Sequence, residues 1–88
     1  MNETIKKIKE KIEALTAETF DGKEPVTPTV FYRDDTLFVS GEDGGYFADY
    51  YGEYRGGYPW IDARLIKIAT DAGMFWEWEN PGCIGLYY

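Results

Sequence analysis

Apolar residues near the start of the chain recur at the spacing of an amphipathic helix. Four of them follow one another at intervals of three, four and three positions: Ile5, Ile8, Ile12 and Leu15. This spacing puts them on one stripe of a helix that Asn2 or Thr4 can cap and that we expect to run to about Ala17. The stripe is shorter than a coiled coil needs, so a helix lying on a sheet in a monomer is favoured over a dimeric coiled coil.

The next apolar stretch predicts a β-hairpin. Residues 20–29 contain two prolines, so no regular element is expected there. Two runs of β-favouring residues follow at 30–32 and 36–39, and Asp34 and Asp35 lie in the turn between them. An Asp-Asp pair favours a tight turn less than Asn-Gly does, so a loop wider than two residues is an alternative.

Residues 42–60 have the most unusual composition in the chain. In nineteen positions they carry five Tyr, five Gly and four carboxylates. We expect a turn at 42–45 and a strand at 46–51, although the spacing of the aromatic residues also matches a helix.

A second helix is predicted to begin at Pro59 and to end at Gly73. Its apolar face repeats at intervals of four, three and four positions: Ile61, Leu65, Ile68 and Ala72. Asp62 would then lie in the first turn, where the helix dipole favours a carboxylate.

The end of the chain predicts a second hairpin, with strands at 74–79 and 83–88 and a Pro-Gly pair suited to a type II turn between them. Trp76 and Trp78 share one face of the first of these strands. The element order α-β-β-β-α-β-β implies a single α+β domain over residues 1–88. We expect a mainly antiparallel sheet with two helices packed on it.

The net charge of −7 lies after residue 23, where four basic residues face eleven acidic ones. Nucleic-acid binding depends on Lys and Arg that neutralise phosphates, so direct binding is disfavoured and a basic protein partner is favoured. Solubility alone would also explain the acidity. The short apolar runs, the charged start and the lone cysteine predict a cytoplasmic protein without a membrane span.

Groups suited to catalysis or metal binding are scarce. The chain has no His, and its single cysteine, Cys83, is better explained as a packing residue than as a nucleophile. Four carboxylates near the predicted turns offer oxygen ligands to Ca²⁺: Asp34, Asp35, Glu42 and Asp43. Their spacing does not match an EF-hand loop, and solvated turn residues explain them better. We expect no enzyme activity, no cofactor and no bound metal.

Binding to a partner is the function class that these residues favour. Tyr supplies a large contact area at low entropic cost, and the five Tyr of this stretch cannot all be buried beside Asp49 and Glu53 without stranding charge. The predicted surface consists of two turns and one aromatic strand. Its partner-binding residues are Asp34, Asp35, Glu42, Asp43, Asp49, Tyr50, Tyr51, Glu53 and Tyr54.

A small, acidic, aromatic-rich domain of this kind resembles the phage-encoded anti-CRISPR proteins, several of which mimic DNA. The resemblance lies in size and charge and rests on no sequence motif. It implies a viral inhibitor that works in the host cytoplasm and occupies the DNA- or PAM-reading groove of a Cas effector complex. Carboxylates would take the places of phosphates, and Tyr rings would fill places where bases stack.

The alternative is a small ligand- or carbohydrate-binding module without catalytic activity. Its platform would be four aromatic rings: Tyr50, Tyr54, Trp76 and Trp78. The lack of a predicted secretion signal counts against this function, because most such modules work outside the cell. A structural subunit of a larger assembly is a third interpretation.

Overall fold

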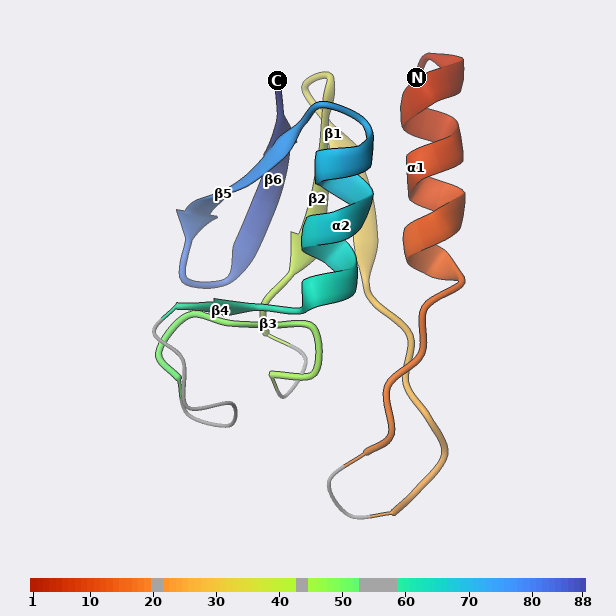
Figure 1. The fold of residues 1–88 in the computed structure, drawn as a ribbon. Helices are drawn as coiled ribbons and strands as arrows, with labels where there is room; N and C mark the ends of the chain where they lie inside the picture. The colour runs from red at the N-terminus through yellow and green to blue at the C-terminus, as the bar shows by residue number, and fades with distance from the viewer. Residues whose placement is uncertain (20–21, 43–44, 53–58) are drawn as a thin grey trace.

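The computed structural model describes residues 1–19, 22–42, 45–52 and 59–88, and these form an α+β fold with two helices and a mainly antiparallel sheet (Figure 1). This confirms the predicted fold class. The elements are α1 (Glu3–Glu13), β1 (Val30–Arg33), β2 (Thr36–Ser40), β3 (Ala48–Asp49), β4 (Trp60–Ile61), α2 (Ala63–Asp71), β5 (Phe75–Asn80) and β6 (Cys83–Tyr87). Four strands form one antiparallel sheet in the order β1-β2-β6-β5, and β3 pairs with β4 in a separate two-stranded ribbon.

Helix α1 begins where the sequence predicts but ends earlier. The Asn2 side chain caps it by accepting a hydrogen bond from the Ile5 N–H at 2.8 Å. The helix ends at Glu13 rather than near Ala17. Ala17 instead exchanges two backbone hydrogen bonds with Val26, so the chain leaves the helix to form a bridge across the loop that follows.

The predicted first hairpin is confirmed, and its turn is as tight as a hairpin turn can be. Arg33 pairs with Thr36, which leaves only Asp34 and Asp35 in the turn. Both aspartates have positive φ, 53° and 63°. This is the backbone of a type I′ turn, and Asp tolerates it because its short side chain can bond locally.

The stretch around β3 and β4 differs most from the prediction. The strand expected at 46–51 is reduced to Ala48–Asp49, and Trp60–Ile61 pairs with it instead of starting a helix at Pro59. Helix α2 starts after Asp62, whose carboxylate accepts the Arg64 N–H at 2.8 Å. Because a capping side chain satisfies a free N–H of the first turn, Asp62 rather than Pro59 determines where the helix begins.

From α2 to the end of the chain, the observed elements agree closely with the predicted ones. Gly73, at φ 71°, ends α2 as predicted, and β5 and β6 form the expected hairpin. The turn between them is not of type II, because Gly82 does not have positive φ. The Asn80 side chain instead accepts the Gly82 N–H at 2.7 Å, which closes the turn by a local side-chain bond.

The core lies between the helices and one face of the four-stranded sheet. Its most completely buried side chains are Ile12, Leu37, Val39, Leu65 and Ile84. In Figure 1, α2 lies in front of the sheet and α1 stands beside it, next to β1, and residues of both helices join the same core cluster. The described part of the chain places no helix behind the sheet. Within the described ranges, the sheet therefore has one face covered by helices and one face without a helix. In the described ranges, neither helix has the length and apolar character required to cross a membrane.

Candidate protein-binding surface

The predicted binding surface does not form one patch. Asp34 and Asp35 are exposed in the turn at one end of β2, and Glu42 follows the other end. A strand rises about 3.3 Å per residue, so Asp35 and Glu42 lie roughly 20 Å apart along it. The Glu42 carboxylate lies against the opposite turn, where a Cβ placed on Gly82 would come within 2.6 Å of its Oε1.

Of the remaining predicted residues that the structure describes, only Tyr51 is well exposed. Asp49 is 5 % exposed and pairs with Trp60 in the β3–β4 ribbon. It is therefore a buried structural residue and not part of an acidic surface, which corrects the prediction. Tyr50 packs its ring edge against Trp78, with centroids 5.2 Å apart, whereas Tyr51 is 58 % exposed. Asp43, Glu53 and Tyr54 lie outside the described residues.

The two tryptophans of the alternative carbohydrate platform belong to the covered side of the sheet. Trp76 and Trp78 are half-buried and pack against the core. The Trp76 indole N–H donates to the Leu65 carbonyl of α2 at 2.8 Å. Neither ring offers the flat exposed face that sugar stacking needs.

The sheet face opposite the helices carries aromatic rings and carboxylates, and we call it the open face. The aromatic and charged residues that strand alternation assigns to it are Phe31, Arg33, Phe38, Phe75, Glu77, Glu79 and Tyr87. This surface was not among the sites predicted from the sequence. The signal that could have found it is the strand alternation, which puts Phe75, Glu77 and Glu79 on the face opposite Trp76 and Trp78.

The aromatic residues of the open face form an ordered layer. The Phe31 and Phe38 rings stack with centroids 5.1 Å apart, and the Arg33 guanidinium lies over both rings, 5.8 and 5.5 Å from their centroids. Gly85 leaves room for this layer, because a Cβ there would lie 2.9 Å from the Tyr87 ring and 3.1 Å from the Phe38 ring. Phe38 is thereby buried to 6 % exposure without a helix above it.

Phe75 and Tyr87 extend the aromatic layer to the β5 edge. Their ring centroids are 6.2 Å apart, and Phe75 is 47 % exposed. The Tyr87 hydroxyl donates to the Glu79 carboxylate. The exposed Phe75 ring lies on the same strand as the exposed Glu77 and Glu79, so apolar and acidic groups are mixed at this edge of the open face.

A hollow of about 280 Å³ opens on the open face beside Cys83, between Arg33 and Glu42. Burial raises the pKa of the Cys83 thiol, and the nearby Glu79 and Glu42 carboxylates raise it further. A reactive cysteine needs the opposite shift, because the thiolate is the nucleophile. The arrangement therefore suits a packing thiol.

Where β1 enters the hairpin turn, the phenol of Tyr32 is affected by Asp34 and Asp35. Partial desolvation raises the pKa of Tyr32, and the charge of Asp35 together with a 3.5 Å hydrogen bond to it adds to the effect. Arg33 Nε and Asp34 Oδ2 are 3.9 Å apart. Both side chains are exposed, so this ion pair adds little stability. No group of three possible metal ligands is found in the part of the chain that the structure describes.

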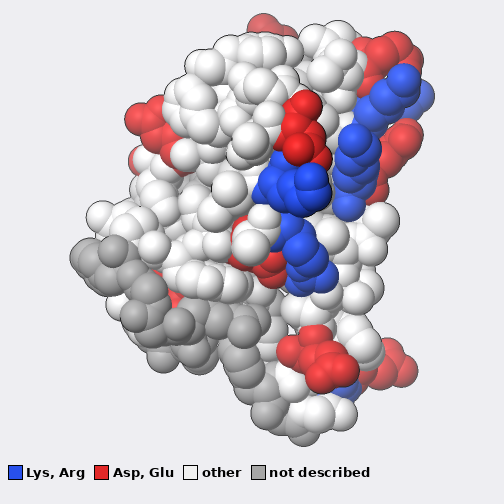
Figure 2. Space-filling view, viewed as in Figure 1, with Lys and Arg blue, Asp and Glu red and all other residues white. Residues whose placement is uncertain are grey.

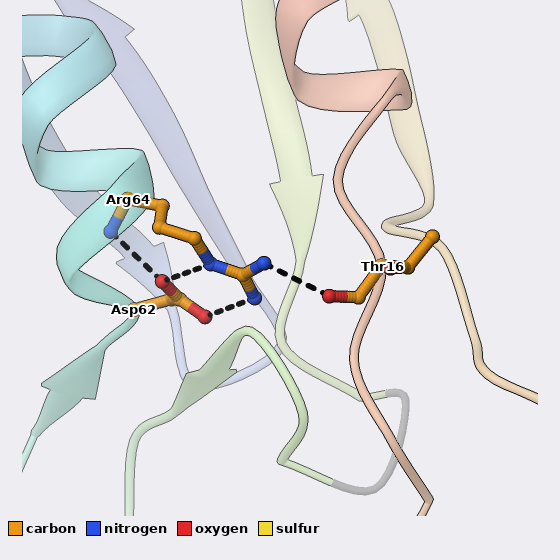
Figure 3. Close-up of polar contacts among 3 residues, drawn as sticks. All are labelled: Thr16, Asp62 and Arg64. Atoms are coloured by element: carbon orange, nitrogen blue, oxygen red, sulfur yellow. Dashed lines mark hydrogen bonds and ion pairs between the residues drawn. The ribbon is translucent and has the colours of Figure 1, made fainter.

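One polar cluster around the buried Asp62 is structural. Asp62 accepts hydrogen bonds from Arg64 Nε at 3.1 Å and Nη2 at 2.9 Å, and Arg64 Nη1 donates to the Thr16 carbonyl at 2.9 Å (Figure 3). The hydrogen bonds to Asp62 raise the pKa of Arg64. The cluster connects the start of α2 to the chain that leaves α1.

Charge is divided unevenly between the helical segments and the rest of the chain. The helical segments 1–14 and 62–72 contain six Lys or Arg and five Asp or Glu, whereas the rest of the chain contains three and eleven. Figure 2 shows basic side chains gathered over the helices. The net negative charge therefore belongs to the sheet and its loops.

Comparisons of the chain with protein-family models, with curated proteins and with solved structures found no match.

Proposed function

We propose that the protein is a non-catalytic binding domain that docks on a basic surface of another protein through the open face. One observation carries the proposal: a sheet face free of helices bears Phe75 and Tyr87 beside Glu77 and Glu79. Aromatic rings supply contact area at low entropic cost, and carboxylates around them select a partner of opposite charge.

The charge division supports the orientation of this docking. The sheet and loops carry the net negative charge, whereas the helical segments are close to neutral. A basic partner is therefore steered toward the sheet side rather than the helices. The same charge disfavours nucleic acid as the partner.

An inhibitor of a Cas effector complex is a narrower form of this proposal, and it stays a prediction together with the cytoplasmic location. Small size, acidity and aromatic residues support it. The spacing of Asp34, Asp35 and Glu42 supports it less, because these carboxylates form no continuous row. In this form, the open face rather than residues 34–54 would contact the DNA-reading groove.

The test is a capture experiment with two matched charge reversals. Glu77→Lys with Glu79→Lys changes the open face, and Glu10→Lys with Glu13→Lys makes the same change in net charge on exposed positions of α1. The bait is used on a lysate with an active CRISPR system, and any captured protein is then purified and titrated with each variant. We expect the open-face variant to bind about tenfold or more weakly and the α1 variant to bind like the unmodified chain.

Equal loss with both variants would show a charge effect without a defined surface and would overturn the proposal. Undiminished binding of the folded open-face variant would also overturn it. If duplex DNA competes with the protein for the purified partner, the inhibitor form is supported. If the partner binds DNA and the protein at the same time, the inhibitor form is contradicted and the docking surface stays supported.

A further inference from the structure

An apolar groove runs along the β5 edge of the four-stranded sheet, whose other outer strand is β1. It lies between α2 and β5, has a volume of about 250 Å³, and is lined by Ile61, by the α2 residues Ile66, Ala69 and Thr70, and by 74–76. Ile66 is 48 % exposed although it is a large apolar residue. Small-molecule pockets are usually larger, roughly 300 Å³ and above, so the groove suits a side chain better than a drug-sized ligand.

The backbone hydrogen bonds show which groups of β5 face outward. Ser40 N–H donates to Thr29 in the direction of β1, and Gly41 N–H donates to Gly82 in the direction of β6. Successive residues of an antiparallel strand direct their backbone groups to opposite neighbours. In this register, the backbone N–H and C=O groups of Gly85 face β5, and those of its partner Glu77 face β6.

The residues on either side of Glu77 therefore present their backbone N–H and C=O groups at the free edge. These residues are Trp76 and, up to the bulge that follows it, Trp78. Among the described residues, no hydrogen bond occupies these backbone groups. A sheet edge of this kind is a template for one more strand.

We propose that β5 binds an extended basic peptide segment of a partner protein as an additional antiparallel strand. Side chains of the added strand alternate between the two faces of the sheet. Those opposite Trp76 and Trp78 point to the helix side, where the groove takes an apolar side chain. Those opposite Glu77 and near Glu79 point to the open face, where carboxylates favour Lys or Arg.

A second copy of this chain is a poorer occupant of the edge. Pairing β5 with its own copy would bring Glu77 and Glu79 of the two chains together, and like charges across strands are destabilising. Each copy also carries a net charge of −7. An alternating apolar and basic segment meets neither obstacle.

The probe is the synthetic peptide acetyl-Lys-Val-Lys-Leu-Lys-Val-amide, titrated into the isotope-labelled full chain and followed by amide NMR. We expect the largest shift changes at Trp76, Glu77, Trp78 and Ile66. Changes confined to the other sheet edge, β1, or no changes at all, would overturn the proposal. Concentration-dependent dimerisation through β5 in the absence of peptide would also overturn it.

Methylation of the peptide backbone gives a matched pair of controls. In an antiparallel pairing, the residues whose side chains enter the groove are those whose N–H groups bond to the edge. N-methylation of Val and Leu should therefore weaken binding about tenfold or more, because several hydrogen bonds are lost. N-methylation of the three lysines should leave the affinity unchanged, and equal affinities of the two methylated peptides would contradict strand addition.

Two protein variants separate this inference from the proposed function. Ile66→Gln changes the groove alone and should weaken peptide binding several-fold, whereas Lys67→Gln, at the next position on α2, is its control. Glu77→Lys should weaken the lysine peptide and strengthen acetyl-Glu-Val-Glu-Leu-Glu-Val-amide. If Ile66→Gln leaves peptide binding intact, strand addition is wrong, and the capture result with the open-face variant stands independently.

Discussion

Asp62 shows how much one carboxylate can determine at the scale of a residue. It caps α2 through the Arg64 N–H, and its two oxygens hold the Arg64 side chain, which reaches across to Thr16 (Figure 3). Only 9 % of Asp62 is exposed, so its charge depends on these partners. The start of a helix and the path of a distant loop are thus fixed by the same side chain.

We predict that Asp62→Ala lowers the free energy of unfolding by about 1 to 2 kcal/mol, because it removes a helix cap and the carboxylate that accepts hydrogen bonds from Arg64 Nε and Nη2. Urea denaturation measures the change. Asp71→Ala removes an exposed partner of Lys67 and should cost less than about 1 kcal/mol. Equal losses in the two variants would show that the Asp62 cluster has no special role.

Local patterns predicted Asp62 near the helix start but could not show what surrounds a carboxylate. Asp49 was expected on a binding surface and is buried, because its exposure depends on β4, a strand of two residues. Nothing in a two-residue segment distinguishes it from a loop until its partner is in place. Burial of polar residues in this part of the chain is therefore decided by tertiary contacts.

At the scale of elements, the hairpins and helix ends were the most predictable features. Both hairpins form where β-favouring runs flank turn residues, and Gly73 ends α2 as expected. These features depend on neighbours within a few positions. The open face and the edge groove depend on which strands become neighbours. The sequence therefore predicted how side chains alternate along a strand, but not which strands would lie side by side.

The Asp34–Asp35 turn allows the local preference to be tested. We predict that replacing the pair by Asn-Gly raises the free energy of unfolding by about 0.5 to 1 kcal/mol, because Asn and Gly adopt the two positive φ angles more readily. Replacing the pair by Ala-Ala removes the same charges and should destabilise the chain. Thermal denaturation checks both variants, and the same sign of change in both would contradict a conformational origin.

On the scale of the whole molecule, the helical segments differ in charge from the strands and loops. The helical segments are close to neutral, whereas the strands and loops carry an excess of acidic side chains, which repel one another electrostatically. Such repulsion destabilises a compact chain and is screened by salt.

We therefore predict that Glu77→Lys raises the free energy of unfolding at low salt by roughly 0.5 kcal/mol, since it reduces repulsion on the acidic side. Glu10→Lys makes the same change of charge on the helical side and should give no such gain. Denaturation at low and at moderate ionic strength measures the difference, which should shrink as salt is added. A difference that persists at high salt would point to packing instead.

The two ends of the chain lie at one end of the molecule (Figure 1), where Met1 and Tyr88 line the same hollow. Short linkers can therefore insert the whole fold into a surface loop of a host protein without stretching either terminus. In such a fusion, the Pro81–Gly82 turn would point away from the host. Displayed in this way, the domain would present its edge strand β5 as a reversible peptide-binding site for immobilisation or for a biosensor.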